Sequence, residues 1–310
     1  VPPAEVGRQL AAWSRPAEAR RASDVRAAAD LAAIRARNPL PPLAGTVDLF
    51  QNRLSILLAH DLAWSPRPVF QSYLATGGAL SRWNAEHLAG PSAPGNVLFE
   101  AWSIDGRLPA LDDALAGLEL LRRYDVVAVS ERFALLRRRP APRRLALAPA
   151  GEATVRLGEE ARVPLPAGRL VWVTVRVEPT LLGRLASLVY KLPELGVRLR
   201  LADGRETRWR YVRSAGEAGF LLSPSVEGAL DMALLVSGPR EPLASKGVTA
   251  IAIRPSRAGS SRAWRDRVEL RFREVVVGPD VRDDEGEAPR PPLREPGRTE
   301  TGEAPTSSSP

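Results

Sequence analysis

The sequence predicts an α+β multidomain protein with three parts: an N-terminal helical connector, a small α/β domain of the βαβ type, and a mostly antiparallel β-sandwich domain. In the first half, short apolar runs alternate with helical patterns, which is typical of a sheet covered by helices. In the second half, short strand patterns follow one another with turn residues between them, which is typical of a sandwich. The 310 residues suffice for about two domains plus linkers.

Composition shifts and proline clusters divide the chain. Ala, Arg, Leu and Glu dominate residues 4–37 and favour a helix there, interrupted at Pro16. A basic, proline-bearing stretch at 137–144 predicts a linker between the two domains. The last residues are polar and proline-rich, with too few apolar side chains to fold. The expected boundaries are 1–45 for the connector, 46–139 for the α/β domain, 140–279 for the sandwich and 280–310 for a disordered tail.

Apolar periodicity places the elements of the α/β domain. Runs of three or four apolar residues predict strands, and leucines spaced three or four apart predict helices. The first strands are expected to pair largely in parallel, because helical patterns separate them. The expected strands are 47–50, 68–70, 96–99, 125–129 and 133–136, and the expected helices are 54–62, 80–88 and 112–124.

The second half shows the two-residue period of strands. Residues 170–177 alternate, with valines on one face and Trp172, Thr174 and Arg176 on the other. Asp203-Gly204 is a strong hairpin turn signal. A helix over 181–190 interrupts the strand pattern. The remaining strands are expected at 197–201, 207–212, 218–222, 248–253 and 268–272.

Composition limits the possible chemistry and partners. The absence of cysteine excludes disulfides, thiolate metal sites and cysteine nucleophiles. The formal charge of +8, carried almost entirely by arginine, would attract phosphate, nucleic acid or anionic lipid. No apolar run reaches the roughly 18 to 20 residues of a membrane helix. The chain also lacks an initiator methionine, so we expect it to be a piece of a longer protein.

Three stretches carry a resemblance to known proteins: WSPRPVFQSY at 64–73, AWSIDGRLPALDD at 101–113 and GFLLSP at 219–224. Together with their surroundings they resemble the soluble C-terminal region of large bacterial polytopic membrane proteins, which are uncharacterised or likened to membrane glycosyltransferases. The resemblance implies a membrane setting, with hydrophobic helices upstream of this chain. It carries over no catalytic residue, since in lipid-linked-sugar glycosyltransferases the catalytic acid lies between membrane helices.

Gln71, Ser72 and Tyr73 are the first candidate ligand-binding residues. They follow an expected strand, and polar groups after a strand of an α/β domain can line a ligand crevice. The favoured alternative is turn chemistry, with a tyrosine packed at the sheet edge.

Asp105, Arg107, Asp112 and Asp113 form the second candidate group. Two carboxylates in a loop could perform acid/base work on a sugar. The favoured alternative is structural: Asp112 or Asp113 caps the following helix, and Asp105 with the next glycine makes a turn.

No catalytic residue, cofactor or metal site is predicted. The only histidines, His60 and His87, lie in helical patterns, and we expect structural or surface roles for them. Two histidines without cysteine also argue against zinc.

Four arginines in the expected hairpin predict a basic stripe, because alternate residues of paired strands share a face. Such a stripe could contact phosphates, anionic glycans or lipids, and the favoured alternative is a solvated surface. Trp209 and Tyr211 are expected on the opposite side. The four residues are Arg198, Arg200, Arg208 and Arg210.

We therefore expect a non-catalytic, soluble, extracytoplasmic portion of a membrane-anchored bacterial envelope protein that binds a glycan, a lipid-linked sugar or another envelope component. The first alternative is an accessory recognition region of a membrane glycosyltransferase. The second alternative is a basic nucleic-acid-binding protein, the least favoured of the three. A cytoplasmic location is the alternative to the extracytoplasmic one.

Overall fold

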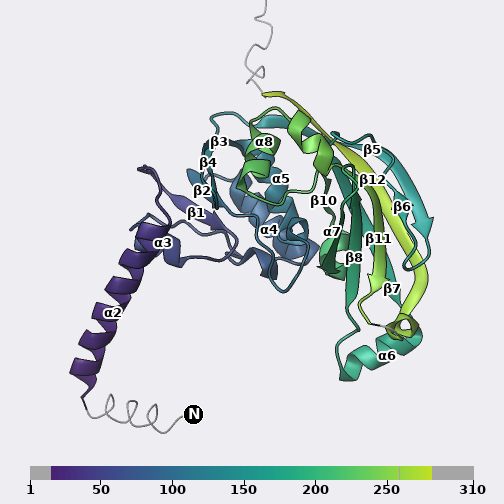
Figure 1. Ribbon diagram of the computed structural model, residues 1–310, viewed down its shortest axis with the longest axis horizontal. Helices are drawn as coiled ribbons and strands as arrows, with labels where there is room; N and C mark the ends of the chain where they lie inside the picture. The colour runs from purple at the N-terminus through teal and green to yellow at the C-terminus, as the bar shows by residue number, and fades with distance from the viewer. Residues whose placement is uncertain (1–14, 258, 281–310) are drawn as a thin grey trace, which may run out of the picture.

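The computed structural model describes residues 15–257 and 259–280 and confirms an α+β architecture with an N-terminal helix (Figure 1). Helix α2 (Pro16–Arg37) projects from the rest of the molecule and has no buried residue. Pro16 is the first residue of this helix, a position that suits proline because the first turn leaves its backbone N–H groups unpaired. The earlier part of the predicted connector helix lies outside the described residues. Among those described, no helix is long and apolar enough to cross a bilayer.

The first sheet has the order β1-β2-β4-β3. Strands β1 and β2 are parallel, whereas β4 is antiparallel to both of its neighbours. Strands β1, β2 and β3 therefore run in the same direction, and their carboxyl ends meet at one edge of the sheet. The strands are β1 (Val47–Phe50), β2 (Asn96–Phe99), β3 (Tyr124–Val129) and β4 (Ala134–Arg138).

Each face of this sheet is covered by apolar side chains. On one face, Ile56 and Leu57 of α3 pack against Val47, Leu49 and Leu135. The other face contacts three longer helices, one of which comes from the second half of the chain. The covering helices are α3 (Ser55–Ala59), α4 (Gly78–Ala89), α5 (Ala114–Arg123) and α8 (Ala229–Val236).

The second half forms the predicted antiparallel β-sandwich. The alternating valines of β7 are buried between the two sheets, as their period of two requires. The hairpin that turns at Asp203-Gly204 joins β8 and β9. One sheet contains β10 (Phe220–Ser223), β7 (Val171–Pro179), β12 (Trp264–Asp280) and β5 (Arg143–Val155). The other contains β6 (Ala161–Arg162), β11 (Val248–Pro255), β8 (Leu195–Leu201) and β9 (Glu206–Tyr211).

Shorter helical segments connect these strands. Helix α6 forms where the helical insertion at 181–190 was predicted, and α7 precedes β10. They are α6 (Leu181–Val189), α7 (Arg213–Ala218), and the 3₁₀ turns η1 (Ser72–Leu74), η2 (Pro109–Leu111), η3 (Glu241–Lys246) and η4 (Ser260–Ala263).

The strand predicted at 68–70 does not form. The main chain of Val69 instead bonds to the side-chain amide of Asn84: its N–H donates to Oδ1 at 2.8 Å, and its carbonyl accepts from Nδ2 at 2.9 Å. One amide side chain thus replaces a neighbouring strand. Gln71, Ser72 and Tyr73, which were expected to follow a strand, therefore follow an irregular segment.

The predicted basic linker is a short connection between β4 and β5. Arg139 and Arg143 both form ion pairs with Asp125 of β3, at 2.6 Å for Arg139. The α/β region and the sandwich also share a hydrophobic core, in which Trp172 of β7 and Met232 of α8 join the apolar residues of α5. The predicted tail lies outside the described residues.

A buried ion network holds the first sheet to its helices. The guanidinium of Arg67 is 1% exposed and pairs with Asp48 of β1 at 2.9 Å and with Asp113 at 3.4 Å. It also donates to the carbonyl of Leu49 at 3.0 Å and to the Ser72 hydroxyl at 3.3 Å. A buried charge is tolerated only when it is paired and hydrogen-bonded, and this one has partners on three sides.

Replacing Arg67 should therefore destabilise the protein strongly. Arg67→Met leaves two buried carboxylates without their cation, and we expect the free energy of unfolding to fall by about 3–5 kcal/mol. The matched substitution Arg82→Met, on the exposed side of α4, should change it by less than about 0.5 kcal/mol. Urea denaturation followed by circular dichroism measures both. Equal, small effects would show that the network does not hold this sheet.

Candidate functional site

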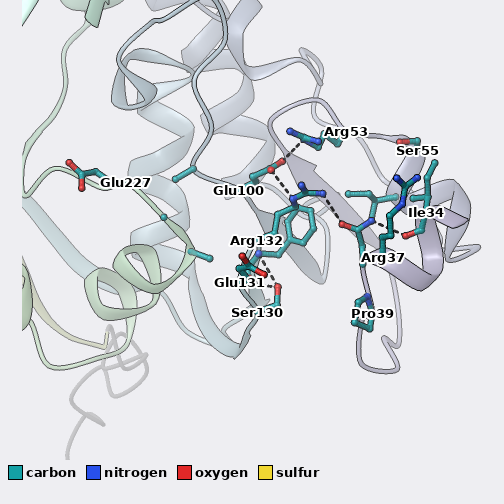
Figure 2. A pocket seen from close by; sticks show the side chains of 16 residues that line it. Ile34, Arg37, Pro39, Arg53, Ser55, Glu100, Ser130, Glu131, Arg132 and Glu227 are labelled. Atoms are coloured by element: carbon teal, nitrogen blue, oxygen red, sulfur yellow. Dashed lines mark hydrogen bonds and ion pairs between the residues drawn. The ribbon is translucent and has the colours of Figure 1, made fainter. Parts of the chain in front are cut away.

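A large cavity lies at the carboxyl edge of the first sheet, where β1, β2 and β3 end (Figure 2). Its volume is about 890 Å³, within the range of small-molecule sites. Five separate segments form its walls: the end of α2, the β1–α3 connection, the residues after β2, the β3–β4 turn and the start of α8. Its polar side chains are Arg37, Asn38, Arg53, Ser55, Glu100, Ser130, Glu131, Arg132 and Glu227.

Glu100, directly after β2, lies between two arginines in Figure 2. Its carboxylate pairs with Arg53 at 3.0 Å and with Arg132 at 3.4 Å. Burial raises the pKa of Glu100, while Arg53 and Arg132 act in the opposite direction. Arg132 also donates to the side-chain oxygen of Asn38 at 2.9 Å, which ties the β3–β4 turn to the end of α2. Both arginines remain partly exposed and can donate further hydrogen bonds.

An aromatic ring lies beside this cluster. The guanidinium of Arg53 stacks over the ring of Trp102, 4.7 Å from its centroid, and Trp102 is partly exposed. Between β1 and Arg53, Gln51 is buried with a φ of 125°, a conformation rare for residues other than glycine. Such strain persists only where the surroundings enforce it, and it is common at binding sites.

The far wall of the cavity comes from the second half of the chain. Glu227, Gly228 and Ala229 form it at the start of α8, and Figure 2 shows Glu227 apart from the Glu100 cluster. The carboxylate of Glu227 pairs with Arg205 at 3.5 Å and with Lys246 at 3.4 Å. The cavity therefore has an acidic group on each side, each compensated by basic side chains.

A smaller, apolar cavity of about 70 Å³ lies between α5 and α8, and Asp112 lines it. Asp112 is 2% exposed, and neither carboxylate oxygen has a hydrogen-bond partner among the described residues. Burial raises the pKa of Asp112 to about 7, against the opposing effect of Arg107. A carboxyl group in this position carries a proton at mildly acidic pH and can act as a hydrogen-bond donor.

The structure brings the predicted site residues into one neighbourhood but uses several of them internally. Ser72 is buried and bonds to Arg67. The guanidinium of Arg107 donates to the carbonyl of Tyr73 at 2.9 Å and lies 3.9 Å from Asp105. Gln71 is the residue before η1. None of these residues lines the large cavity.

The predicted capping role of Asp112 or Asp113 is wrong. Asp113 does precede α5, but it has a φ of 54° and makes no side-chain capping bond. Its carboxylate instead pairs with Arg67 and accepts from Asn84 at 2.8 Å and from Ser81 at 3.3 Å. Leaving the buried guanidinium of Arg67 without an anion would cost more free energy than one side-chain capping bond contributes. The predicted turn at Asp105 forms, because Asp105 and Gly106 both have positive φ.

The four hairpin arginines share a face, with Arg198 directly opposite Arg208. Trp209 and Tyr211 pack into the sandwich core on the opposite side, as predicted. Each of the four arginines, however, has acidic partners. Arg198 and Arg200 pair with Glu160 at 2.8 and 2.9 Å. The partners of the other two are Glu206 for Arg208, at 3.9 Å, and Glu194 for Arg210, at 2.9 Å.

The predicted stripe is therefore charge-compensated.

Both histidines have structural surroundings. The Nε2 atom of His60 lies 2.7 Å from the carbonyl oxygen of Asn38, and burial lowers the pKa of His87 in α4. The described residues contain no group of three or more His, Cys, Asp or Glu side chains that could hold a metal ion.

Sequence reasoning missed Arg53, Glu100 and Arg132, although a signal for them exists. Each follows a correctly predicted strand, and the carboxyl ends of strands running in one direction form the ligand edge of α/β sheets. The same rule was applied to Gln71–Tyr73, after a segment that is not a strand. The contribution of α8 to the cavity has no signal in the local sequence.

No protein-family model matches the sequence, and no curated protein is similar to it. The resemblance to the C-terminal regions of bacterial polytopic membrane proteins therefore stays a prediction.

The raised pKa of Asp112 predicts a pH-dependent stability. The unfolded chain loses this proton near pH 3.8 and the folded chain near pH 7, so stability falls as pH rises through this window. Asp112→Asn removes the cost of burying an ionised carboxylate. It should raise the free energy of unfolding at pH 8.5 by on the order of 2 kcal/mol, with little effect at pH 4. Urea denaturation at both pH values measures this. The matched control Asp24→Asn, exposed on α2, should leave the free energy of unfolding unchanged at both pH values. A pH-independent effect of Asp112→Asn would contradict the assignment.

Proposed function

We propose that this chain is a non-catalytic binding region of a bacterial envelope protein, anchored in the membrane by another part of the protein, and that the cavity at the sheet edge binds a glycan. The observation that carries the proposal is the Glu100 cluster inside a cavity of about 890 Å³. A cavity of this size accepts a ligand of a few sugar rings.

The chemistry of the walls suits sugar hydroxyls, each of which donates and accepts a hydrogen bond. Arg37, Arg53 and Arg132 supply donors, and Glu131 and Glu227 supply acceptors. Ile34, Pro39 and Phe133 provide apolar surface between them. Trp102 does not line the cavity, but its ring carries the guanidinium of Arg53, which does.

Binding without chemistry is supported by how the carboxylates are held. Glu100 pairs with two arginines and Glu227 with Arg205 and Lys246, so each carboxylate already has two cationic partners within the protein. An accessory role in a membrane glycosyltransferase would use the same cavity for acceptor or donor. The nucleic-acid alternative receives less support, because the arginine face of the hairpin is compensated by acidic partners.

An extracytoplasmic location is part of this proposal and rests on the resemblance. The exposed helix α2, which connects to the cavity through Ile34 and Arg37, is suited to join the binding region to a preceding segment.

Binding can be tested with a panel of purified neutral and acidic cell-wall and capsular oligosaccharides, followed by titration calorimetry of each binder. We expect micromolar to millimolar dissociation constants that change little between low and physiological salt for neutral ligands. Arg132→Ala and Trp102→Ala should each weaken binding at least about tenfold, which corresponds to the loss of one good contact.

The matched controls are Arg82→Ala and Trp83→Ala, both exposed on α4 away from the cavity. They should leave affinity unchanged. Equal losses from site and control variants, or no binding to any oligosaccharide, would refute the glycan proposal. Turnover of a nucleotide-sugar or lipid-linked sugar by the chain would refute its non-catalytic part.

A further inference from the structure

Helix α6, at the end of the sandwich, carries its apolar side chains on the outside (Figure 1). Leu188 and Val189 are 82% and 91% exposed, and the following Tyr190 is 80% exposed. The leucines are spaced to share one helix face. The exposed apolar set is Leu181, Leu182, Leu185, Leu188, Val189 and Tyr190. Exposed apolar clusters of this kind mark interaction sites.

The helix is fixed in this orientation. The Thr180 hydroxyl accepts from the N–H of Gly183 at 3.1 Å and donates to the carbonyl of Arg262 at 2.9 Å. Gly183 packs so closely that an added Cβ would lie 2.2 Å from the carbonyl oxygen of Ala263. The glycine side of α6 is therefore pressed onto η4, and the leucine side cannot turn inward.

The charges around this face are basic. Residues 181–191 contain Arg184 and Lys191 and no acidic residue, and the underlying η4 contributes Arg262. The nearest acids along the chain are already paired: Glu178 with Arg176 at 2.6 Å and with Arg265 at 3.3 Å, and Glu194 with Arg210 at 2.9 Å. An apolar helix with a basic surround and a tyrosine at its end complements an anionic lipid surface.

The position of α6 agrees with such a surface. In Figure 1, α6 and the N-terminal end of α2 both lie at the lower border of the molecule, on opposite sides of the view. A plane along this border would meet α6 and the first residues of α2. Helix α6 is also a convex tip of nine residues, about 14 Å long. A fluid bilayer accommodates such a tip, whereas a protein partner would need a matching groove.

We propose that α6 is a membrane-surface anchor. Its leucine face enters the acyl boundary of an anionic bilayer, while Arg184 and Lys191 contact lipid phosphates. One short helix gives reversible binding, so α6 orients a protein that another segment attaches more firmly. This proposal goes beyond glycan binding and does not depend on the edge cavity, which lies at the other end of the molecule from α6.

Co-sedimentation of the full chain with vesicles tests the anchor. We expect binding to phosphatidylcholine vesicles that contain 30% phosphatidylglycerol, at least tenfold weaker binding to pure phosphatidylcholine, and weakening as salt is raised. Leu185→Asp with Leu188→Asp should reduce the partition coefficient at least tenfold, and Arg184→Glu with Lys191→Glu should reduce it at least fivefold. These side chains are exposed, so the thermal midpoint should not change.

Two matched pairs serve as controls. Leu58→Asp with Leu230→Asp changes leucines exposed to a similar extent on α3 and α8, and Arg82→Glu with Arg144→Glu makes the same charge change elsewhere. Both should leave binding within twofold of the unchanged protein. Absent vesicle binding, or equal losses in controls, would overturn the proposal. Dimerisation in sedimentation velocity that the α6 leucine variants abolish would also overturn it, because a second copy would then cover this face.

Discussion

The buried guanidinium of Arg67 is the interaction on which the first half of the structure depends. Removing a charge from water is costly, so the chain must surround it with anions and carbonyls. Asp48 and Leu49 of β1 do so from one side, Ser72 of η1 from another, and Asp113 from the start of α5. One side chain thereby fixes a strand, an irregular segment and a helix relative to each other.

The network also sets the electrostatics of this region. Two carboxylates share one guanidinium, and burial raises the pKa of Asp113 to about 6. Asp112, next to it, is held against an apolar cavity without a hydrogen-bond partner among the described residues, and its pKa is raised further. Both groups make the protein less stable as pH rises from acid to neutral, because the unfolded chain gives up these protons first. Arg53 follows β1, the strand that this network contacts through Asp48 and Leu49.

The sandwich completes the site from the other side. Helix α8 belongs to the second half of the sequence, yet it packs on the first sheet beside α5, and its first residues form a wall of the cavity. Trp172 of β7 and Val275 of β12 enter the same core. The two regions therefore stay in one relative position, which keeps Glu227 and the Glu100 cluster in separate walls of one cavity. The cavity at this edge requires both halves.

The sequence predicts what depends on local periodicity. Alternating valines give β7, and the Asp-Gly turn gives the hairpin, because side chains in strands alternate with a period of two. It fails where tertiary contacts override local signals. Val69 pairs with an asparagine side chain and not with a strand, and Asp113 serves a buried arginine and not a helix start. Nothing in the sequence around Arg67 distinguishes this buried arginine from the many exposed ones. The cavity could be predicted only in part, from the polar residues after three strands, since α8 reaches it through long-range packing.

The two proposals assign different roles to two separate parts of the surface: membrane attachment to the apolar face of α6, and glycan binding to the edge cavity. The apolar face of α6 and the N-terminal end of α2 lie toward one border of the molecule. The edge cavity lies in the α/β region, away from α6. A protein held at a membrane by α6 and a preceding segment would thus keep the edge that we propose binds a glycan in a constant orientation, which is useful for an extended, immobile ligand.

The central claim is that both halves form one cooperative unit around the shared core. Native-state hydrogen exchange at increasing denaturant tests it most directly, by comparing peptides that cover Ala114–Arg123 of α5 and Ala229–Val236 of α8. We predict that the slowest amides of both helices open with the same free energy and the same denaturant dependence. Opening of α5 at a lower free energy, while α8 stays protected with the sandwich, would contradict the claim.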